Sequence, residues 1–492
     1  MLDQSFSHEN FRVIMDVENR KGNYLEDKGF FESSDLFKKS REITDQIIVL
    51  NNQISIERVS LKKIVNPKPE DYEEYNNLIA AKEELKQNRE IERKLILTEL
   101  SQKTNSEDYK IKVEKGQIKF GSQLYVAENE PEHYFVLKQL QRNIYKTFKV
   151  KQSDRREILS QLKTFLEDDF PKYVVRTDIK SFYESIPHKH LLSKIEENSL
   201  LSYPSKRIIR DILNQYWKIL LSDGVKKASD ERIGIPRGIG ISAYLSELYL
   251  RDFDRKISSQ KNVSFYARYV DDIIFVITPK LKSENVSTAS IKIELSKLLA
   301  STCHLQINNK KTTVIDLCLN SSKLEQFIYL GYKFSLGYRN EMVAGKNELN
   351  KVPLEITMSN DKFNRYKTKV KLAFESYSNE FIKYPGKHSS INRKLLIRIK
   401  FLTNNFQLFR RKQNVLVGIF FSNEFINKYE DLIKLDAYLK RQITSVAATV
   451  NPNLLLKLNR LSFKDGFNKK RFLKFNYKSF ESGKVLEIWK NI

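Results

Sequence analysis

The chain has 492 residues, enough for two or three domains, and its 86 Lys and Arg against 61 Asp and Glu give a net charge of +25, which predicts nucleic acid as a partner. No apolar window reaches the length of a membrane span, and the amino terminus lacks the basic start and apolar core of a signal peptide, so we expect no membrane partner. The two cysteines, Cys303 and Cys318, are too few for a disulfide framework or a cysteine zinc site, and we expect reduced thiols in a cytoplasmic protein.

Residues 33–104 carry apolar side chains at helical spacing in a charged background. Pro67 and Pro69 interrupt this pattern and predict two separate helices. The apolar positions are Ile43, Ile47 and Leu50 in the first stretch and Leu78, Leu85, Leu95 and Leu100 in the second. We expect these stripes to pack against the rest of the chain or against another subunit.

Basic residues gather between positions 146 and 156, and Ser153-Asp154 predicts the start of a helix just before Arg155 and Arg156. A guanidinium group presents paired donors that fit phosphate oxygens, so either arginine is a candidate for a triphosphate contact. A solvated basic helix start explains the same residues.

The run from Tyr173 to Asp178 begins with β-branched residues and predicts a strand that ends on an aspartate, with Phe182 and Tyr183 following. Farther along, apolar runs at 264–268 and 273–277 flank Tyr269-Val270-Asp271-Asp272, which predicts a β-hairpin with the aspartate pair at its turn. Taken alone, Asp178 could be a helix N-cap and the pair a solvated turn.

Adjacent carboxylates repel each other and become favourable when divalent cations bind, and oxygen ligands suit Mg²⁺, with Mn²⁺ as the alternative ion. Nucleotidyl transfer uses two such ions, whose ligands come from separate strands that converge on one point. Asp178 and Asp271, with Asp272 as a helper, meet this requirement.

Together these segments resemble a reverse transcriptase. Asp178 with Phe182 and Tyr183 is similar to the first catalytic block of the family, and residues 269–272 are similar to its Tyr-x-Asp-Asp block. Three further segments resemble the block after a Pro-Gln-Gly signature, the lysine-bearing block and the primer-grip hairpin, namely residues 234–243, 307–312 and 327–332. The five blocks occur in the order of the family over about residues 170–335.

The resemblance implies a function for several side chains. Asp178, Asp271 and Asp272 would be metal ligands, joined by the main-chain carbonyl of Ile179. Tyr183, beside Phe182, would lie beneath the sugar of the incoming nucleotide and exclude a 2′-hydroxyl, which implies dNTP substrates. Lys311, or alternatively Lys310, would stand near the leaving pyrophosphate. Each of these residues also has a simpler explanation as a core aromatic or a surface lysine.

Position 237 departs from the family pattern. Most members have glutamine close to the incoming nucleotide, and this chain has Arg237 followed by Gly238, whose missing side chain permits close backbone approach. Residues 236–247 and 176–186 are similar to the bacterial abortive-infection and other defence-associated reverse transcriptases with a C-terminal helical-repeat domain. That similarity covers roughly residues 130–450.

The expected fold class is α+β. We expect a helical N-terminal extension at residues 1–104, fingers at 105–170, a palm with an antiparallel sheet and helices at 171–340, and an all-α helical-repeat domain at 341–492. In the last region helical patterns cover residues 362–374, 392–402 and 431–443.

The resemblance implies an antiphage-defence DNA polymerase that copies a dedicated non-coding RNA template or extends DNA without a template from a protein tyrosine. Its partners would be dNTPs, an RNA template or DNA product, and further copies of the chain in a trimer or hexamer. Two other functions stay open from the residues. One is a mobile-element reverse transcriptase or maturase, and the other is a catalytically idle nucleic-acid-binding protein.

Overall fold

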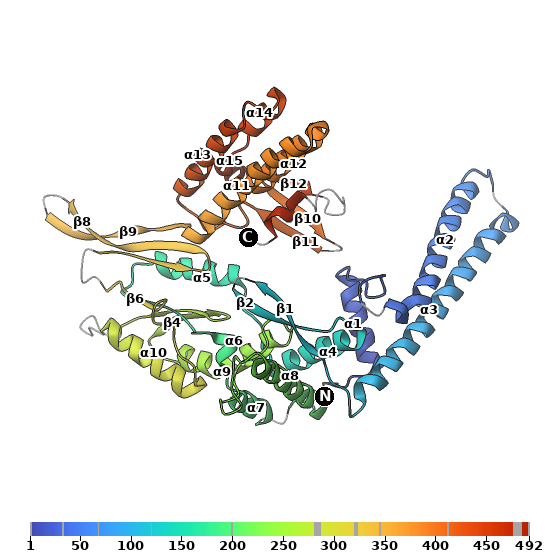
Figure 1. The fold of residues 1–492 in the computed structure, drawn as a ribbon, viewed down its shortest axis with the longest axis horizontal. Helices are drawn as coiled ribbons and strands as arrows, with labels where there is room; N and C mark the ends of the chain where they lie inside the picture. The colour runs from blue at the N-terminus through green and yellow to red at the C-terminus, as the bar shows by residue number, and fades with distance from the viewer. Residues whose placement is uncertain are drawn as a thin grey trace. The chain divides into compact units, whose positions relative to one another are not determined.

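The computed structural model describes residues 2–31, 34–66, 68–119, 121–197, 200–279, 287–318, 323–343, 346–410, 413–475 and 485–490. Helices and mainly antiparallel sheets alternate along the chain (Figure 1), so the α+β class is confirmed. The contacts divide the chain into two compact units. The first contains Met1–Lys151 with Tyr183–Tyr249, and the second contains Gln152–Phe182 with Leu250–Ile492.

The first unit begins with α1 (His8–Arg20) and a helical hairpin made of α2 (Lys38–Leu61) and α3 (Glu73–Asn105) (Figure 1). Short 3-10 turns precede the two long helices, at Ser34–Phe37 and Pro69–Tyr72. The buried positions of α2 are Ser40, Ile47, Ile54 and Leu61, a seven-residue spacing that faces α3. The prediction of two helices separated near the prolines is confirmed, although Pro67 itself lies outside the described residues.

The rest of the first unit combines a hairpin with helices. Its elements are β1 (Val113–Lys119), β2 (Ser122–Ala127), α4 (Pro131–Phe148), α7 (His188–Glu196) and α8 (Tyr203–Ser222). Two helices cross the boundary between the units, α6 (Phe182–Ser185) and α9 (Ser242–Ser258).

A four-stranded antiparallel sheet forms the centre of the second unit, in the order β4-β5-β3-β6. The strands are β3 (Tyr173–Asp178), β4 (Val263–Tyr269), β5 (Asp272–Ile277) and β6 (Thr313–Asp316). The helix α5 (Arg155–Glu167) contacts β4, and α10 (Thr288–Cys303) contacts β6. Asp154 caps α5 by accepting from the main-chain N–H of Arg156 and Glu157, so the predicted helix start is confirmed.

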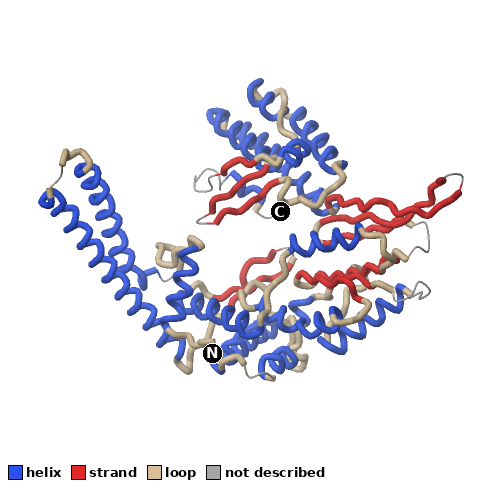
Figure 2. The backbone as a smooth tube through the Cα atoms, turned by 180° about the vertical axis from the view of Figure 1, so that it is seen from behind, coloured by secondary structure: helices blue, strands red, loops and turns tan. Residues whose placement is uncertain are grey.

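A second antiparallel sheet follows, made of β7 (Leu324–Tyr329), β8 (Tyr332–Val343) and β9 (Lys346–Met358). The C-terminal region then mixes helices with a small sheet, shown as red strands among blue helices in Figure 2. Its elements are α11 (Asn360–Lys383), a 3-10 turn (Pro385–Lys387), α12 (His388–Thr403), β10 (Asn405–Arg410), β11 (Gln413–Gly418), α13 (Glu430–Ser445), α14 (Pro452–Asn459), α15 (Phe463–Lys469), β12 (Phe472–Phe475) and a 3-10 turn (Glu487–Trp489).

The helices predicted at 362–374, 392–402 and 431–443 are confirmed as parts of α11, α12 and α13. The expectation that residues 341–492 contain helices alone was wrong, because β9 and the sheet β11-β10-β12 lie there. The strands β10 and β11 have only six residues each, and an apolar run of that length does not distinguish strand from helix.

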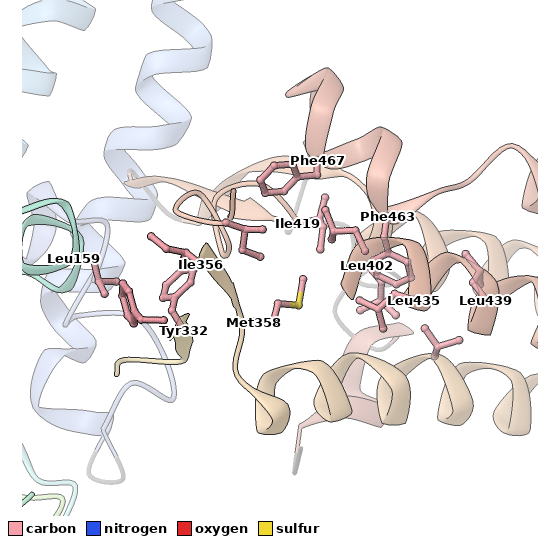
Figure 3. Packing of buried hydrophobic residues seen from close by; sticks show 14 of the residues in the cluster. Leu159, Tyr332, Ile356, Met358, Leu402, Ile419, Leu435, Leu439, Phe463 and Phe467 are labelled. Atoms are coloured by element: carbon pink, nitrogen blue, oxygen red, sulfur yellow. The ribbon is translucent and has the colours of Figure 1, made fainter. Parts of the chain in front are cut away.

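One hydrophobic core runs through the second unit (Figure 3). It joins Leu159 of α5 and Tyr332 of β8 to Leu402 of α12, Leu435 of α13 and Phe463 of α15. The C-terminal helices therefore share buried apolar surface with the sheet that ends in the aspartates, and each fully buried side chain of this kind contributes about 1.5–3 kcal/mol. No helix in the described ranges is both long and apolar enough to cross a membrane.

Candidate active site

The aspartate pair lies at a two-residue hairpin turn, as the sequence predicted. Tyr269 at the end of β4 pairs with Asp272 at the start of β5, so Val270 and Asp271 form the turn itself. Val270 has a positive φ of 61°, a conformation that is costly for a β-branched residue. The surrounding contacts must compensate for that strain.

An ion pair between the buried Arg268 and the partly exposed Asp254 supports the turn from within the second unit. The Arg268 guanidinium donates through Nη1 to the carbonyl of Val270 at 2.9 Å. Its Nε and Nη2 donate to the two carboxylate oxygens of Asp254 at 2.9 and 2.7 Å, and the Tyr266 hydroxyl donates to the same carboxylate at 2.5 Å. Arg268 is only 6% exposed and its contact with the partly exposed Asp254 is bidentate, a geometry that strengthens charge-assisted hydrogen bonds. It fixes the path of the backbone into Asp271.

Asp178 reaches the same end of the sheet from the neighbouring strand. In the β3–β5 pair Asp178 stands opposite Asp272, and the N–H of Ile179 donates to the carbonyl of Asp271 at 3.3 Å. The three aspartates, far apart in the sequence, are thus placed on two adjacent strands and the turn between β4 and β5. Asp178 is only 5% exposed.

Two basic residues and one amide bind these carboxylates. The Lys311 ammonium lies 3.2 Å from Oδ2 of Asp178, and the Asn308 side-chain amide donates to the same oxygen at 3.1 Å. The Arg176 guanidinium donates to Oδ1 of Asp272 at 2.7 Å and to the carbonyl of Lys311, also at 2.7 Å. Lys311 was a sequence candidate, whereas Asn308 and Arg176 were missed as site residues. Side chains alternate between the two faces of a strand, so positions 176 and 178 of β3 share one face, and this alternation could have identified Arg176 as a site residue.

Burial raises the pKa of the Asp271 carboxyl above its ordinary value, and the negative charge of Asp178 raises it further. Burial also raises the pKa of Asp272, where Arg176 opposes the shift and Asp178 adds to it. Two carboxylates that are held near each other and away from water retain negative charge at a free-energy cost. A divalent cation or a proton relieves that cost.

The donor chemistry fits Mg²⁺ or Mn²⁺, because Asp178, Asp271 and Asp272 place three carboxylates at one sheet end, where burial, and then the charge of Asp178, raise the pKa of the other two. Within the described ranges no group of three His, Cys, Asp or Glu side chains already stands at metal-ligand spacing. The ion pairs with Lys311 and Arg176 occupy carboxylate oxygens that a cation would need. The ligand assignments, including the carbonyl of Ile179, stay predictions.

Tyr183 and Arg237 contact each other within the first unit. The guanidinium carbon of Arg237 lies 5.0 Å from the centre of the Tyr183 ring, and Nη2 lies 3.1 Å from a carboxylate oxygen of Glu184. The N–H of Ile235 donates to the carbonyl of Tyr183 at 2.8 Å, which joins the two loops. The unusual arginine therefore has a structural partner on each side.

Gly238 adopts a positive φ of 110°, and a Cβ there would lie 2.6 Å from the carbonyl oxygen of Tyr125 in β2. The N–H of Tyr125 in turn donates to the carbonyl of Arg237 at 2.7 Å. At Gly240 an added Cβ would lie 2.0 Å from the Gln141 side chain. Packing inside the first unit explains both glycines, and the nucleotide approach expected at Gly238 stays a prediction.

The remaining nucleotide-contact candidates have protein partners of their own. The Phe182 ring is buried. Arg155 donates to the carbonyl of Leu330 and lies 5.7 Å from the centre of the Tyr332 ring, whereas Arg156 lies 2.9 Å from Glu424. These contacts connect the start of α5 to the β7–β8 turn and to the C-terminal region, rather than to the aspartates. The triphosphate contact of either arginine stays a prediction.

Part of the chain that contains these residues matches a known protein family. Residues 133–334 match the family model described as reverse transcriptase (RNA-dependent DNA polymerase). This range contains all three aspartates, Lys311 and the residues around Arg237. No curated protein matches the chain.

The structures similar to this chain include telomerases of two yeasts. Apo telomerase from Candida tropicalis, truncated from its C-terminal domain, is 12% identical with a TM-score of 0.29, covering 49% of this chain and 55% of that one. Telomerase from Candida albicans in complex with a telomeric RNA fragment is 13% identical with a TM-score of 0.28, covering 73% and 56%. Another apo telomerase from Candida tropicalis is 13% identical with a TM-score of 0.31, covering 77% of this chain and 60% of that one. The chain spans just over half the length of these three telomerases.

The raised pKa of Asp271 makes the stability of the metal-free protein depend on pH. Because the folded pKa lies above the ordinary value of 3.8, this group contributes stability below that value and loses the contribution as the pH rises through the folded pKa. Asp271→Asn is neutral at every pH, so we expect it to raise the melting temperature near pH 7 and to lose this advantage near pH 4. Thermal unfolding in EDTA at several pH values measures the difference.

Asp361→Asn is the matched control, since Asp361 is an exposed carboxylate in the first turn of α11. Its melting temperature should follow that of the unsubstituted protein at both pH values. If Asp271→Asn were no more stable than the control near pH 7, the argument from carboxylate repulsion would fail.

Proposed function

We propose that the chain is an RNA-directed DNA polymerase that adds deoxynucleotides to a 3′-hydroxyl at the sheet end that carries Asp178, Asp271 and Asp272, within the residues 133–334 that match the reverse transcriptase family model. The observation that carries the proposal is the pairing of Asp178 with Asp272 on adjacent strands, next to the Asp271 turn. Carboxylates from separate strands that converge on one point are what two-metal nucleotidyl transfer requires.

In this mechanism the three aspartates hold the divalent cations, which supply an activated 3′-hydroxyl and a stabilised leaving pyrophosphate when they are bound. Arg176 and Lys311 bind the carboxylates of Asp272 and Asp178 while no cation is there, and so limit the cost of repulsion. Lys311, with its side chain more than half exposed, is placed to offset charge on the leaving group. Arg268 and Asp254 keep the strained turn in the position that this chemistry needs.

We assign the preference for deoxynucleotides to Tyr183, on its resemblance to the ring that lies beneath the nucleotide sugar in the family. The contact with Arg237 supports this assignment, because a guanidinium held 5.0 Å from the ring by Glu184 restricts the orientations of the tyrosine side chain. Arg237 acts here as a positioning residue for Tyr183.

The central test is Asp271→Asn. The amide keeps the size of the side chain but lacks the negative charge that a metal ligand requires, so incorporation of labelled dNTPs in Mg²⁺ should fall to background. The assay uses the purified chain with its copurifying nucleic acid, so that no template has to be assumed.

Asp361→Asn removes the same charge from the surface of α11 and should incorporate dNTPs as the unsubstituted chain does. Circular dichroism should show that Asp271→Asn is folded. Undiminished incorporation by folded Asp271→Asn would refute the site.

The mode of synthesis is the next proposal. We propose that the chain either copies a dedicated non-coding RNA or extends DNA without a template from one of its own tyrosine hydroxyls. The basic surplus of the chain fits both modes, because an RNA template and a growing DNA strand carry the same backbone charge.

Phenol–chloroform partitioning of labelled product separates the two modes. A protein primer predicts that DNA enters the aqueous phase only after protease treatment, because the product stays covalently bound to the chain. An RNA template predicts product that is aqueous without protease and complementary in sequence to a copurified RNA. Aqueous product with no complementary RNA would contradict both.

We further propose a function in antiphage defence, carried out in the cytoplasm by a homo-oligomer, a trimer or a hexamer. The support is the similarity of residues 236–247 and 176–186 to abortive-infection reverse transcriptases. In a bacterial host that produces the chain, we expect phage plating efficiency to fall by at least about tenfold. The same host with Asp271→Asn should plate phage normally. Equal protection by both chains would separate the defence function from polymerisation, and the absence of protection from any of a broad phage panel would refute it.

A further inference from the structure

A basic pocket lies next to the aspartates in the second unit and shares Arg176 and Lys311 with the mechanism above, whereas its other lining residues have no role there. Its volume is about 400 Å³, within the range of roughly 300–1,000 Å³ that is usual for small-molecule sites. Strands β3 and β6, the loop before β6, the β7–β8 hairpin and the start of α11 contribute its walls. Its polar lining is Arg176, Lys310, Lys311, Thr313, Gln326, Lys333 and Asn360.

The charge of this pocket is unbalanced. Four basic side chains line it, and its described lining contains no Asp or Glu. Arg176 and Lys311 are partly compensated by Asp272 and Asp178. Lys310 and Lys333, in contrast, form no ion pair with any described residue. A cavity with that charge attracts an anion.

Two atoms of the lining residues also lack hydrogen-bond partners. Nε of Arg176 and the hydroxyl oxygen of Thr313 are both buried, and neither has a partner among the described residues. A buried donor without a partner costs about 1–3 kcal/mol, and native proteins keep few of them. The two belong to adjacent strands, since Arg176 of β3 stands opposite Thr313 of β6. Residues directly opposite each other in a sheet share one face, so an acceptor-rich ligand over this face would satisfy both donors at once.

We propose that this pocket binds a phosphate group, with Arg176 Nε and the Thr313 hydroxyl as donors and Lys310 and Lys333 as the neutralising charges. Phosphate oxygens accept several hydrogen bonds and carry the negative charge that the lining lacks. The phosphate can come from free pyrophosphate or from the backbone of a bound nucleic acid strand.

The pocket is linked to the aspartates through two side chains. Arg176 and Lys311 line the pocket and bind Asp272 and Asp178 at the same time. A phosphate group in the pocket competes with these carboxylates for the two cations and frees carboxylate oxygens. The inference does not rest on polymerisation, because binding is measured on the metal-free chain.

The test uses Thr313→Val and Lys333→Gln in the full chain with EDTA. Isothermal titration with inorganic pyrophosphate forms one arm, and titration with a single-stranded DNA oligonucleotide forms the other. If the natural ligand is pyrophosphate, each substitution should weaken pyrophosphate binding at least tenfold. If it is a nucleic acid strand, each should weaken binding of the oligonucleotide by the same factor. Lys371→Gln, which removes the same charge from an exposed ion pair on α11, should leave binding unchanged.

Thr313→Val also separates a binding function from a merely structural one. Valine suits a strand and removes the buried hydroxyl that has no partner, so we expect the ligand-free protein to melt at a higher temperature while ligand binding weakens. The proposal is overturned if neither arm responds to Thr313→Val and Lys333→Gln, or if Lys371→Gln weakens binding as much as they do.

Discussion

The repulsion among three carboxylates, one of them buried and two half-buried, is the constraint on which the site depends. Asp178, Asp271 and Asp272 meet where β3 and β5 end, and burial together with the charge of Asp178 raises the pKa of the other two. A protein that needed only stability would not place aspartates there. The cost is limited by Lys311 and Arg176, whose ion pairs hold the carboxylates in place until a stronger counter-charge binds.

The rest of the second unit serves this geometry. The positive φ of Val270 turns the chain sharply enough to place Asp271 at the tip, and the buried Arg268, paired with Asp254, donates to the Val270 carbonyl. Behind the sheet, the apolar core extends without a break into the C-terminal helices. The C-terminal region therefore contributes to the rigidity of the sheet through this shared core.

Local patterns explain which features the sequence could predict. The β-branched run before Asp178 and the apolar runs around Asp271 each determine a strand, and the hairpin turn follows from them without any knowledge of distant contacts. The resemblance to reverse transcriptases then predicted that the ends of the two strands lie close together. Helices such as α11 and α13 were predicted because their apolar periodicity extends over three or more turns.

Tertiary proximity explains what the sequence could not predict. Asn308 binds Asp178 because the loop before β6 lies beside the end of β3, and nothing local distinguishes it from many other polar residues. Arg176 shares a strand face with Asp178, but its partner Asp272 comes from β5, a neighbour that the local pattern does not reveal. The contacts of Arg155 with Leu330 and of Arg156 with Glu424 are equally non-local. The short strands β10 and β11 were missed because six residues do not reveal a period.

The central claim is that these carboxylates share divalent cations, and direct binding of Mn²⁺ tests it without any assumption about template, primer or product. Electron paramagnetic resonance of Mn²⁺ added to the metal-free chain should show saturable binding that Asp178→Asn and Asp271→Asn each abolish and that Asp361→Asn leaves intact. Equal Mn²⁺ binding by all four proteins would contradict the account.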